Sequence, residues 1–380
     1  MYRMLTVFAF LAAVALPAGA QARPSPLDLS LEPDQARAVM AVLTARADGD
    51  TVPDSLWARL HAAEGYRRAM ERERGMNELF GLDRGINDAS FREWVLSEPS
   101  LDQLEAQRVA LAAWEAVDLE WAGARALAYL PPGARLKATI YPIIREQQNS
   151  FVWEDGTGDP AIFMYVHPGK AAADLQHTLA HELHHIGLSG VCTEAGTPTT
   201  PELAQAKRWL SGFGEGIAVL AAAGGPDSPT HPHDPPEILD PWVARLDSLE
   251  QDMSELEGFF TEILDGRLSG DEIGRRGLTF FSRPGSPQAA FYTVGWHMAV
   301  TVERALGRDA VIASLCDPAR LLLDYQKVAT EAPSDSPIRS TPDSIRSTPD
   351  SIRFTPDSPI WSASFIQRIR QLAATDEGIR

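Results

Sequence analysis

The chain reads His181-Glu182-Leu183-His184-His185, an H-E-x-x-H pattern, inside a segment with the apolar spacing of a helix. Residues four apart lie on one face of a helix, so His181 and His185 can direct two imidazoles at one metal ion. Glu182 is offset from His181 by about 100°, which places it beside a water on that ion rather than among the ligands. The pentapeptide supplies two candidate zinc ligands and a candidate general base.

The surroundings of the pentapeptide support this interpretation. Residues 161–166 form an apolar, aromatic and β-branched run typical of a strand, and His167-Pro168-Gly169 closes it. Residues 170–186 carry leucines at helical spacing, and Gly187 is a helix stop signal. A strand, a tight turn and a buried helix bearing the motif favour a zinc hydrolase. The alternative is a structural helix with histidines on its polar surface.

A catalytic zinc site needs a third protein ligand. The metzincin pattern would place a glycine at Leu188 and a histidine at Val191, so that subclass is excluded. No further histidine occurs before His231. A carboxylate ligand from a later helix is the other option, and Glu215 in the stretch Phe213-Gly-Glu-Gly-Ile-Ala218 is the candidate. Its small neighbours would let that helix pack close to the first.

The pairing of H-E-L-H-H with a downstream G-E-G-I-A resembles the Glu-zincins (gluzincins). More narrowly, it resembles a family described as zinc-dependent peptidases and catalogued as a domain of unknown function. The resemblance covers about residues 130–330 and includes residues 290–298, which look like a later helix of that family. It implies a zincin-like fold in which His181, His185 and Glu215 bind Zn²⁺ and Glu182 is the base.

The resemblance carries one further implication and one departure. It implies that an edge strand, here residues 161–166, aligns an extended peptide. In the best-known Glu-zincins an Asp four residues after the glutamate orients the first histidine, but this chain has Val219 there. Metal-bound imidazoles donate their second N–H to a carboxylate or carbonyl, so another partner is needed. Asp174, Glu194 and backbone groups are candidates.

Other residues near the motif have both functional and structural interpretations. Tyr292 is a candidate donor to the oxyanion, on the strength of the resemblance, and is equally compatible with the core. His297 is the alternative donor. His177 shares the ligand face one turn earlier and fits a supporting or surface role, because a fourth ligand would block the open position. His184 is expected to be exposed or bonded to the backbone, and His231-Pro232-His233-Asp234 to form a solvated loop.

The N-terminus has the pattern of a signal peptide over residues 1–22. Arg3 precedes an apolar run over residues 5–16, and small residues place cleavage near Ala20 or Ala22. The run is too short to span a membrane. We therefore expect an exported protein, secreted or periplasmic, with no membrane insertion after cleavage.

Charge and cysteine content limit the partners. The formal net charge is −18, which speaks against nucleic acid and anionic membrane surfaces as partners. The expected partner is the peptide or protein substrate that the resemblance to zinc peptidases implies. Cys192 and Cys316 are the only cysteines. In an oxidising compartment they can form one disulfide, and two free thiols are the alternative. The sequence does not indicate the oligomeric state.

The expected fold class is α+β, mostly helical, with a small sheet. Residues 23–130 are predicted as an N-terminal helical region, and residues 131–330 as the zincin-like metallopeptidase domain with strands over 137–144 and 151–153. A heptapeptide rich in Pro and Ser repeats within residues 331–360, which predicts a disordered insertion. Residues 361–380 are predicted as a C-terminal helix.

The sequence thus predicts an exported zinc metallopeptidase in which a zinc-activated water attacks the peptide bond with Glu182 as general base. One alternative is a zinc hydrolase acting on other amides or on esters, which needs the same site. Another is a catalytically inactive zincin-fold binding module. The intact Glu182 argues against that last interpretation, because a structural site has no need of a base.

Overall fold

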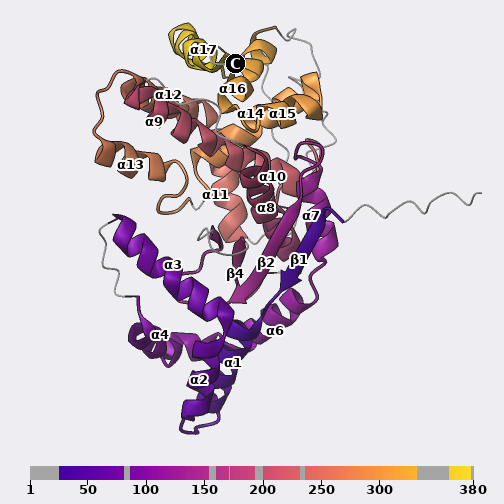
Figure 1. The fold of residues 1–380 in the computed structure, drawn as a ribbon, viewed down its shortest axis with the longest axis vertical. Coiled ribbons are helices and arrows are strands. Elements are labelled where there is room, and N and C mark those ends of the chain that lie inside the picture. The colour runs from indigo at the N-terminus through magenta and orange to yellow at the C-terminus, as the bar shows by residue number, and fades with distance from the viewer. Residues whose placement is uncertain are drawn as a thin grey trace, which may run out of the picture.

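The computed structural model describes residues 25–80, 86–153, 160–170, 172–192, 200–231, 236–286, 288–331 and 359–377. Helices surround a small sheet: in Figure 1, α1, α2 and α4 lie below it, α3 lies beside it, and most later helices lie above it. The predicted mostly helical α+β class is confirmed. The elements are β1 (Leu27–Leu31), α1 (Asp34–Ala47), α2 (Asp54–Ala62), α3 (Glu64–Phe80), α4 (Asp88–Val95), α5 (Glu98–Asp102), α6 (Leu104–Glu115), α7 (Leu119–Leu127), β2 (Leu136–Ile143), β3 (Phe151–Trp153), β4 (Ala161–Tyr165), α8 (Ala172–Val191), α9 (Pro201–Leu210), the 3-10 helix η1 (Ser211–Phe213), α10 (Gly214–Ala223), α11 (Pro236–Asp247), α12 (Leu249–Leu264), α13 (Gly270–Thr279), α14 (Ala290–Leu306), α15 (Arg308–Ser314), α16 (Pro318–Glu331) and α17 (Ala363–Glu377).

The sheet has the strand order β1-β2-β4-β3. β1, β2 and β4 are parallel, whereas β3 is antiparallel to β4, with Phe151 opposite Phe163. β4 therefore lies inside the sheet, and the expectation that residues 161–166 form its edge is wrong. Every β4 side chain is buried, as in a strand covered on both faces. The edge next to β4 is formed by β3.

Strand β1 was not expected, because the sequence pattern predicts only helices and loops for residues 23–130. In β1, three partly buried leucines alternate with the exposed Asp28 and Ser30. This period of two indicates a strand, but it extends over only five residues. β1 pairs with β2, Leu27 opposite Leu136, so the N-terminal region contributes a strand to the sheet.

Different helices cover the two faces of the sheet. On one face, Ile140 of β2 belongs to the main core together with Leu179 of α8. On the other face, Tyr141 and Phe151 both stack on Phe163, with ring centroids 5.2 and 4.8 Å away. Helix α3 packs against this aromatic row. The helix that carries the H-E-x-x-H motif and the N-terminal helix α3 therefore lie on opposite sides of the same strands.

Helix α8 is longer than predicted, because it continues through Gly187 to Val191. A side chain at Gly187 would overlap Leu130. This glycine therefore lets α8 pack closely against the chain before β2 and does not end the helix. Val191 is followed directly by Cys192, at the point where α8 does end.

The predicted N-terminal helical region is divided into short helices. Ala63 has an extended backbone that ends α2 before α3 begins. The break between α6 and α7 lies before Asp118, whose side chain accepts a hydrogen bond from the backbone of Trp121 and caps α7.

Helices α10 and α14 cross with their backbones in contact. A β-carbon at Gly216 would overlap the backbone of α14, and one at Gly295 would lie 2.6 Å from the carbonyl oxygen of Phe213. Residues with a side chain do not permit this approach. The crossing brings the first turn of α10, with Glu215, beside the first turn of α14, with Tyr292.

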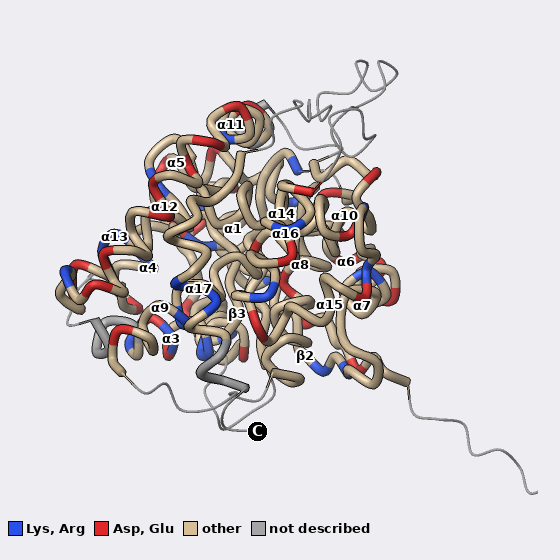
Figure 2. The backbone as a smooth tube through the Cα atoms, turned by 90° about the horizontal axis from the view of Figure 1, so that it is seen from above, with Lys and Arg blue, Asp and Glu red and all other residues tan. Residues whose placement is uncertain are grey.

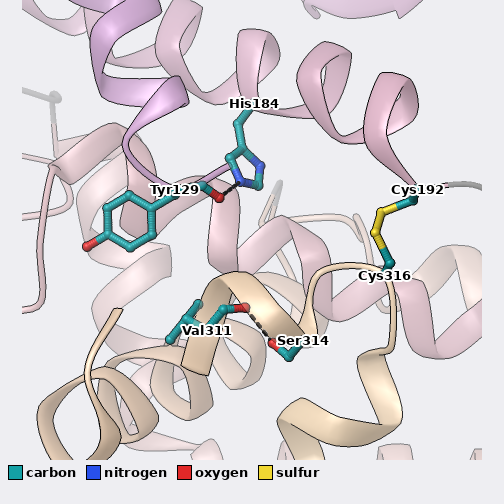
Figure 3. The surroundings of a disulfide bond; sticks show 6 residues. All are labelled: Tyr129, His184, Cys192, Val311, Ser314 and Cys316. Carbon is teal, nitrogen blue, oxygen red and sulfur yellow. Dashed lines mark hydrogen bonds between the residues drawn. A yellow bond between two sulfur atoms is a disulfide. The ribbon is translucent and has the colours of Figure 1, made fainter. Parts of the chain in front are cut away.

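Cys192 and Cys316 form a disulfide (Figure 3). Of the two alternatives for these cysteines, the structure therefore contains the bridge, which joins residues separated by 124 positions. Cys316 lies between α15 and α16. The disulfide fastens the C-terminal end of the motif helix to that pair of helices.

Several predictions fall on parts of the chain that are not described. These are the signal peptide over residues 1–22, most of the heptapeptide repeats, Glu194, and the pair His233 and Asp234. The predicted C-terminal helix is present as α17 and buries Phe365 and Ile369. Within the described ranges, no helix combines the length and the apolar character needed to cross a membrane.

Acidic and basic residues are interspersed along the helices seen in Figure 2. The surplus of acidic residues that gives the chain its formal charge of −18 is therefore spread over many elements in this view rather than confined to one. Charge of this kind acts on association with partners and does not determine the fold.

Candidate metal centre and active-site cleft

The two motif histidines lie on one face of α8. Their Nε2 atoms are 3.1 Å apart, and their side chains are 12% and 25% exposed for His181 and His185. Leu179 and Leu183, on the other side of the helix, are fully buried and hold α8 against the core. The helical spacing and the apolar anchor together fix both imidazoles toward the same point.

Glu215 approaches both histidines from the first turn of α10. Its Oε2 atom lies 3.1 Å from Nε2 of His181 and 3.1 Å from Nε2 of His185. Among the described residues, these three side chains form the group of His, Cys, Asp and Glu that could hold a metal ion. The structure thus brings together the three residues predicted as ligands, although 30 positions separate His185 from Glu215.

The spacing of the three donor atoms fits a zinc ion. Ligand atoms at about 2.0–2.1 Å from Zn²⁺ in a tetrahedral shell lie about 3.3 Å from each other. The observed separations of 3.1 Å agree with that edge length. Two imidazoles and one carboxylate are also a donor set that zinc accepts at catalytic sites, where three protein ligands leave one position open.

The electrostatics of the three side chains favour a positive charge between them. Burial alone would lower the pKa of His185, but the carboxylates of Glu215 and Glu182 raise it to about 9. Burial alone would raise the pKa of Glu215, yet the charges and hydrogen bonds of the two imidazoles hold it well below its usual range. Groups that stabilise a proton in this way are suited to a divalent cation.

Glu182 lines the same cleft as His181. Burial raises the pKa of its carboxyl and the charge of Glu215 acts in the same direction, while the two imidazoles partly oppose the shift. The net effect is a raised pKa. A carboxyl that accepts a proton more readily than an ordinary glutamate is suited to take a proton up and return it.

Tyr292 lies against the candidate metal centre. Its ring is parallel to that of His181, with centroids 5.9 Å apart, and the carboxylate of Glu215 is among the groups that act on its hydroxyl. Burial raises its pKa well above the usual value, and the charges of Glu215 and Glu182 add to the effect. The phenol therefore keeps its proton and can act as a donor. Of the two interpretations of Tyr292, the one that places it at the site agrees with this position.

These side chains face a cleft of about 580 Å³. One wall is apolar and includes Leu175 of α8 with Val219 and Ala222 of α10. The lining also includes the polar residues Asn149 and Ser150, which directly precede the edge strand β3. The cleft is thus bounded both by the motif helix and by the edge of the sheet.

Two further histidines line the cleft. His231 is 9% exposed and packs edge-on against Trp242, with ring centroids 4.8 Å apart, so the prediction that it lies in a solvated loop is wrong. Trp242 belongs to α11, and the sequence carries no signal that would pair the two residues. His177 also lines the cleft, with its ring 5.2 Å from that of Trp121, and lies outside the candidate ligand group.

His184 and His297 point away from the cleft. His184 is fully buried beside the backbone carbonyl of Tyr129, at 3.3 Å, so it is bonded to the backbone and not exposed (Figure 3). Burial lowers its pKa to about 3. His297 lies 3.2 Å from the hydroxyl of Tyr325 and does not line the cleft, so Tyr292 is the better-placed donor of the two candidates.

Asp174 does not meet the need for a partner of the first histidine. It is buried and lines the cleft, but it precedes His181 by seven residues, or about 10.5 Å along the helix axis. That distance is too long for a hydrogen bond to the imidazole. Val219, at the position where an Asp was expected, is buried in the apolar wall.

A metal-binding pair on one helix, a glutamate on a second helix and a neighbouring carboxylate in a cleft are the parts of a metal-dependent hydrolase. Comparison with protein families agrees with this class: residues 57–334 match a family described as "putative zinc dependent peptidase (DUF5700)". The match covers more than half of the chain, and the chain belongs to this family. Comparisons with curated proteins and with solved structures gave no match.

The family match is longer than the motif resemblance. It begins at residue 57, whereas the resemblance extends only from about residue 130. It therefore includes most of the N-terminal helices, among them α3, which covers one face of the sheet. Residues 57–130 of the N-terminal region are thus part of the unit that the family model describes, whereas β1 and α1 precede it.

Proposed function

We propose that this protein is an exported zinc-dependent metallopeptidase of the Glu-zincin type. The observation that carries the proposal is the convergence of the Nε2 atoms of His181 and His185 with Oε2 of Glu215, at 3.1 Å from one another. A structural zinc site is closed by four protein ligands, whereas this group has three among the residues that the structure describes. Glu182, in the same cleft, supplies the base that only a catalytic site needs.

The proposed chemistry divides between the metal and the side chains. Zinc at this site would acidify a water and polarise the carbonyl of the substrate. Glu182 takes a proton from the water and passes it to the leaving amine, and its raised pKa suits both transfers. Tyr292 donates its hydroxyl hydrogen to the carbonyl oxygen as negative charge develops there.

The proposed substrate is an extended peptide. An edge strand presents unpaired backbone N–H and C=O groups, and a peptide can pair with them as an added strand. The cleft reaches Ser150, directly before β3, so a peptide along this edge passes the candidate metal centre. β3 thus takes the role that the resemblance gave to residues 161–166. Export rests on the predicted signal peptide alone, and a peptide or protein is the proposed partner.

Metal content tests the ligands. The purified protein, supplied with zinc, is expected to hold one zinc per chain by mass spectrometry, and His185→Ala is expected to lose at least about 90% of it, because two ligands bind zinc far more weakly than three. His177→Asn is the matched control: it removes a histidine from the same helix that lies outside the ligand group and should keep its zinc. Equal zinc in His185→Ala and wild type would refute the proposed centre.

Activity tests the base. Glu182→Gln is expected to keep zinc and to hydrolyse fluorescently labelled casein about 10²–10⁴-fold more slowly, because general-base catalysis contributes that factor. Unchanged hydrolysis in this variant would remove Glu182 from the mechanism. A panel of small esters measured beside casein separates a peptidase from an esterase. If the zinc-loaded wild type hydrolyses neither class of substrate, the alternative of a catalytically inactive binding module would be favoured.

A further inference from the structure

The segment between β2 and β3 is attached to the N-terminal helices. At its start, the side-chain amide of Gln35, from α1, makes two hydrogen bonds with the backbone of Ile144: it donates to the carbonyl oxygen and accepts from the N–H, each at 2.9 Å. Gln35 is 2% exposed. A helix side chain thus continues the backbone hydrogen bonding at the end of β2.

The next residue, Arg145, makes a buried ion pair with Glu73 of α3. Nη2 of Arg145 lies 3.1 Å from Oε1 of Glu73, and the two residues are 7% and 2% exposed. Arg145 also donates to the side-chain oxygen of Gln147, from Nε at 3.2 Å and from Nη2 at 2.8 Å. One guanidinium therefore connects α3 to the chain just before the cleft-lining residues.

The same cluster holds the first residue of β3. The guanidinium carbons of Arg72 and Arg145 lie 4.0 and 5.2 Å from the ring centroid of Phe151, within cation–π range. Arg72 is itself paired with Glu73 at 2.8 Å. The ring of Phe151 also stacks on Phe163 of β4 at 4.8 Å. Both guanidinium groups that contact Phe151 thus share the carboxylate of Glu73.

The residues between these two attachments face the cleft. Gln148, Asn149 and Ser150 line it, and the hydroxyl of Ser150 accepts a hydrogen bond from the backbone of Tyr165 at 3.1 Å. Removal of Glu73 would break the ion pairs with Arg72 and Arg145 in a largely buried place, and breaking buried ion pairs is unfavourable. The conformation of this cleft wall therefore depends on a residue of the N-terminal region.

We propose that Glu73 and Arg145 are positioning residues for the peptide substrate: they hold the cleft wall formed by residues 148–150 and the edge strand β3 where an extended peptide pairs with them. The inference rests on the proposed peptidase function and extends it, because it assigns the N-terminal helices a part in substrate binding. Neither residue lines the cleft, so each acts through the segment that it holds.

Hydrogen exchange tests the positioning directly and needs no activity. In the full chain, Glu73→Gln is expected to speed amide exchange of residues 146–153 by about tenfold or more, which corresponds to about 1.4 kcal/mol of local stability, while the core of α8 exchanges as in wild type. Glu105→Gln is the matched control, because Glu105 pairs with Arg108 at the surface and is 80% exposed. Unchanged exchange of residues 146–153 in Glu73→Gln would overturn the proposal.

Kinetics tests the link to substrate. For labelled casein, Glu73→Gln should raise KM about tenfold and leave kcat within about twofold, since binding of the extended chain is what weakens. A fluorogenic dipeptide amide, too short to pair along β3, should keep its KM. Equal losses on both substrates would show a general structural role and overturn the proposal. If Glu73→Gln does not fold, Arg145→Lys, which keeps the charge but not the forked contacts, takes its place.

A double variant tests whether Glu73 and Arg145 act together, and the exchange measurement distinguishes a failure of this proposal from a failure of the proposed function. The double variant Glu73→Gln/Arg145→Gln should raise KM no further than the more damaging single variant, because both changes break one contact network. Fully additive effects would contradict the proposed pair. If zinc-loaded wild type cleaves neither casein nor the dipeptide amide, the proposed function fails and the substrate role fails with it, whereas the exchange measurement still reports whether Glu73 orders the segment.

Discussion

Burial and the charges of Glu215 and Glu182 keep the hydroxyl of Tyr292 protonated by raising its pKa. In the proposed mechanism this proton is available to the substrate oxygen. The ring, which is parallel to that of His181, holds the hydroxyl in place. Position and donor capacity in Tyr292 are thus separable, since a phenylalanine retains the ring and lacks the donor.

Tyr292→Phe is therefore expected to lower kcat on casein by about 10²–10³-fold, the usual cost of losing one donor to an oxyanion. KM and zinc content should stay within about twofold of wild type, because the ring still packs beside His181. Steady-state kinetics and metal analysis on the same preparations give the measurement. A kcat equal to that of wild type would mean that Tyr292 serves only in packing.

At the scale of single residues, the sequence predicted those positions of site residues that follow from the geometry of one helix. The spacing of His181 and His185 defines their shared face without any knowledge of the fold. Glu215 was a candidate from its small neighbours on a later helix, and the family resemblance then implied it as a ligand, because no local rule links it to a helix 30 positions earlier. His231 was misjudged, since its burial depends on Trp242, a contact that only tertiary packing creates.

At the scale of elements, the crossing of α10 and α14 determines how close Glu215 comes to Tyr292. Gly216→Ala adds a β-carbon that would overlap the backbone of α14. We expect it to lower the free energy of unfolding by about 1–3 kcal/mol or more, as overpacking does, and to weaken zinc binding through the adjacent Glu215. Urea unfolding and zinc titration measure the two effects.

The matched control is Gly258→Ala, in the middle of α12. Nothing lies within 4 Å of the added β-carbon there, so the change should stabilise the protein by about 0.5–1 kcal/mol through helix propensity. Similar unfolding midpoints for the two variants would show that α10 and α14 can separate without loss. The close crossing would then not be what positions Glu215.

Element types were predicted better than their arrangement. The strands over residues 137–144 and 151–153 and the motif helix follow from periodicity, which is local. β1 was not predicted because its alternation of apolar and polar residues extends over only five positions. The interior place of β4 could not be read from its own residues alone, since strand order depends on pairings such as that of β3, which comes before β4 in the chain yet forms the outer edge.

At the scale of the molecule, the disulfide between Cys192 and Cys316 spans 124 positions. Constraint of a loop of that length in the unfolded chain contributes up to about 5 kcal/mol in the chain-entropy description. The variant Cys192→Ser/Cys316→Ser is expected to lose about 2–5 kcal/mol of unfolding free energy in urea and to keep its zinc, because neither cysteine is a ligand. An unchanged unfolding midpoint would show that native contacts alone hold these helices.

The disulfide also turns residues 192–316 into a covalent ring. Glu215 and Tyr292 lie within that ring, whereas His181 and His185 lie on the arm that enters it at Cys192. A single cut by another protease anywhere in the ring would open it without releasing either fragment, so all members of the candidate centre would remain on one covalently connected molecule. If the protein is the exported peptidase proposed above and meets other proteases, a first backbone cut in the ring would not separate Glu215 and Tyr292 from the two histidines. Separation would also require reduction of the disulfide.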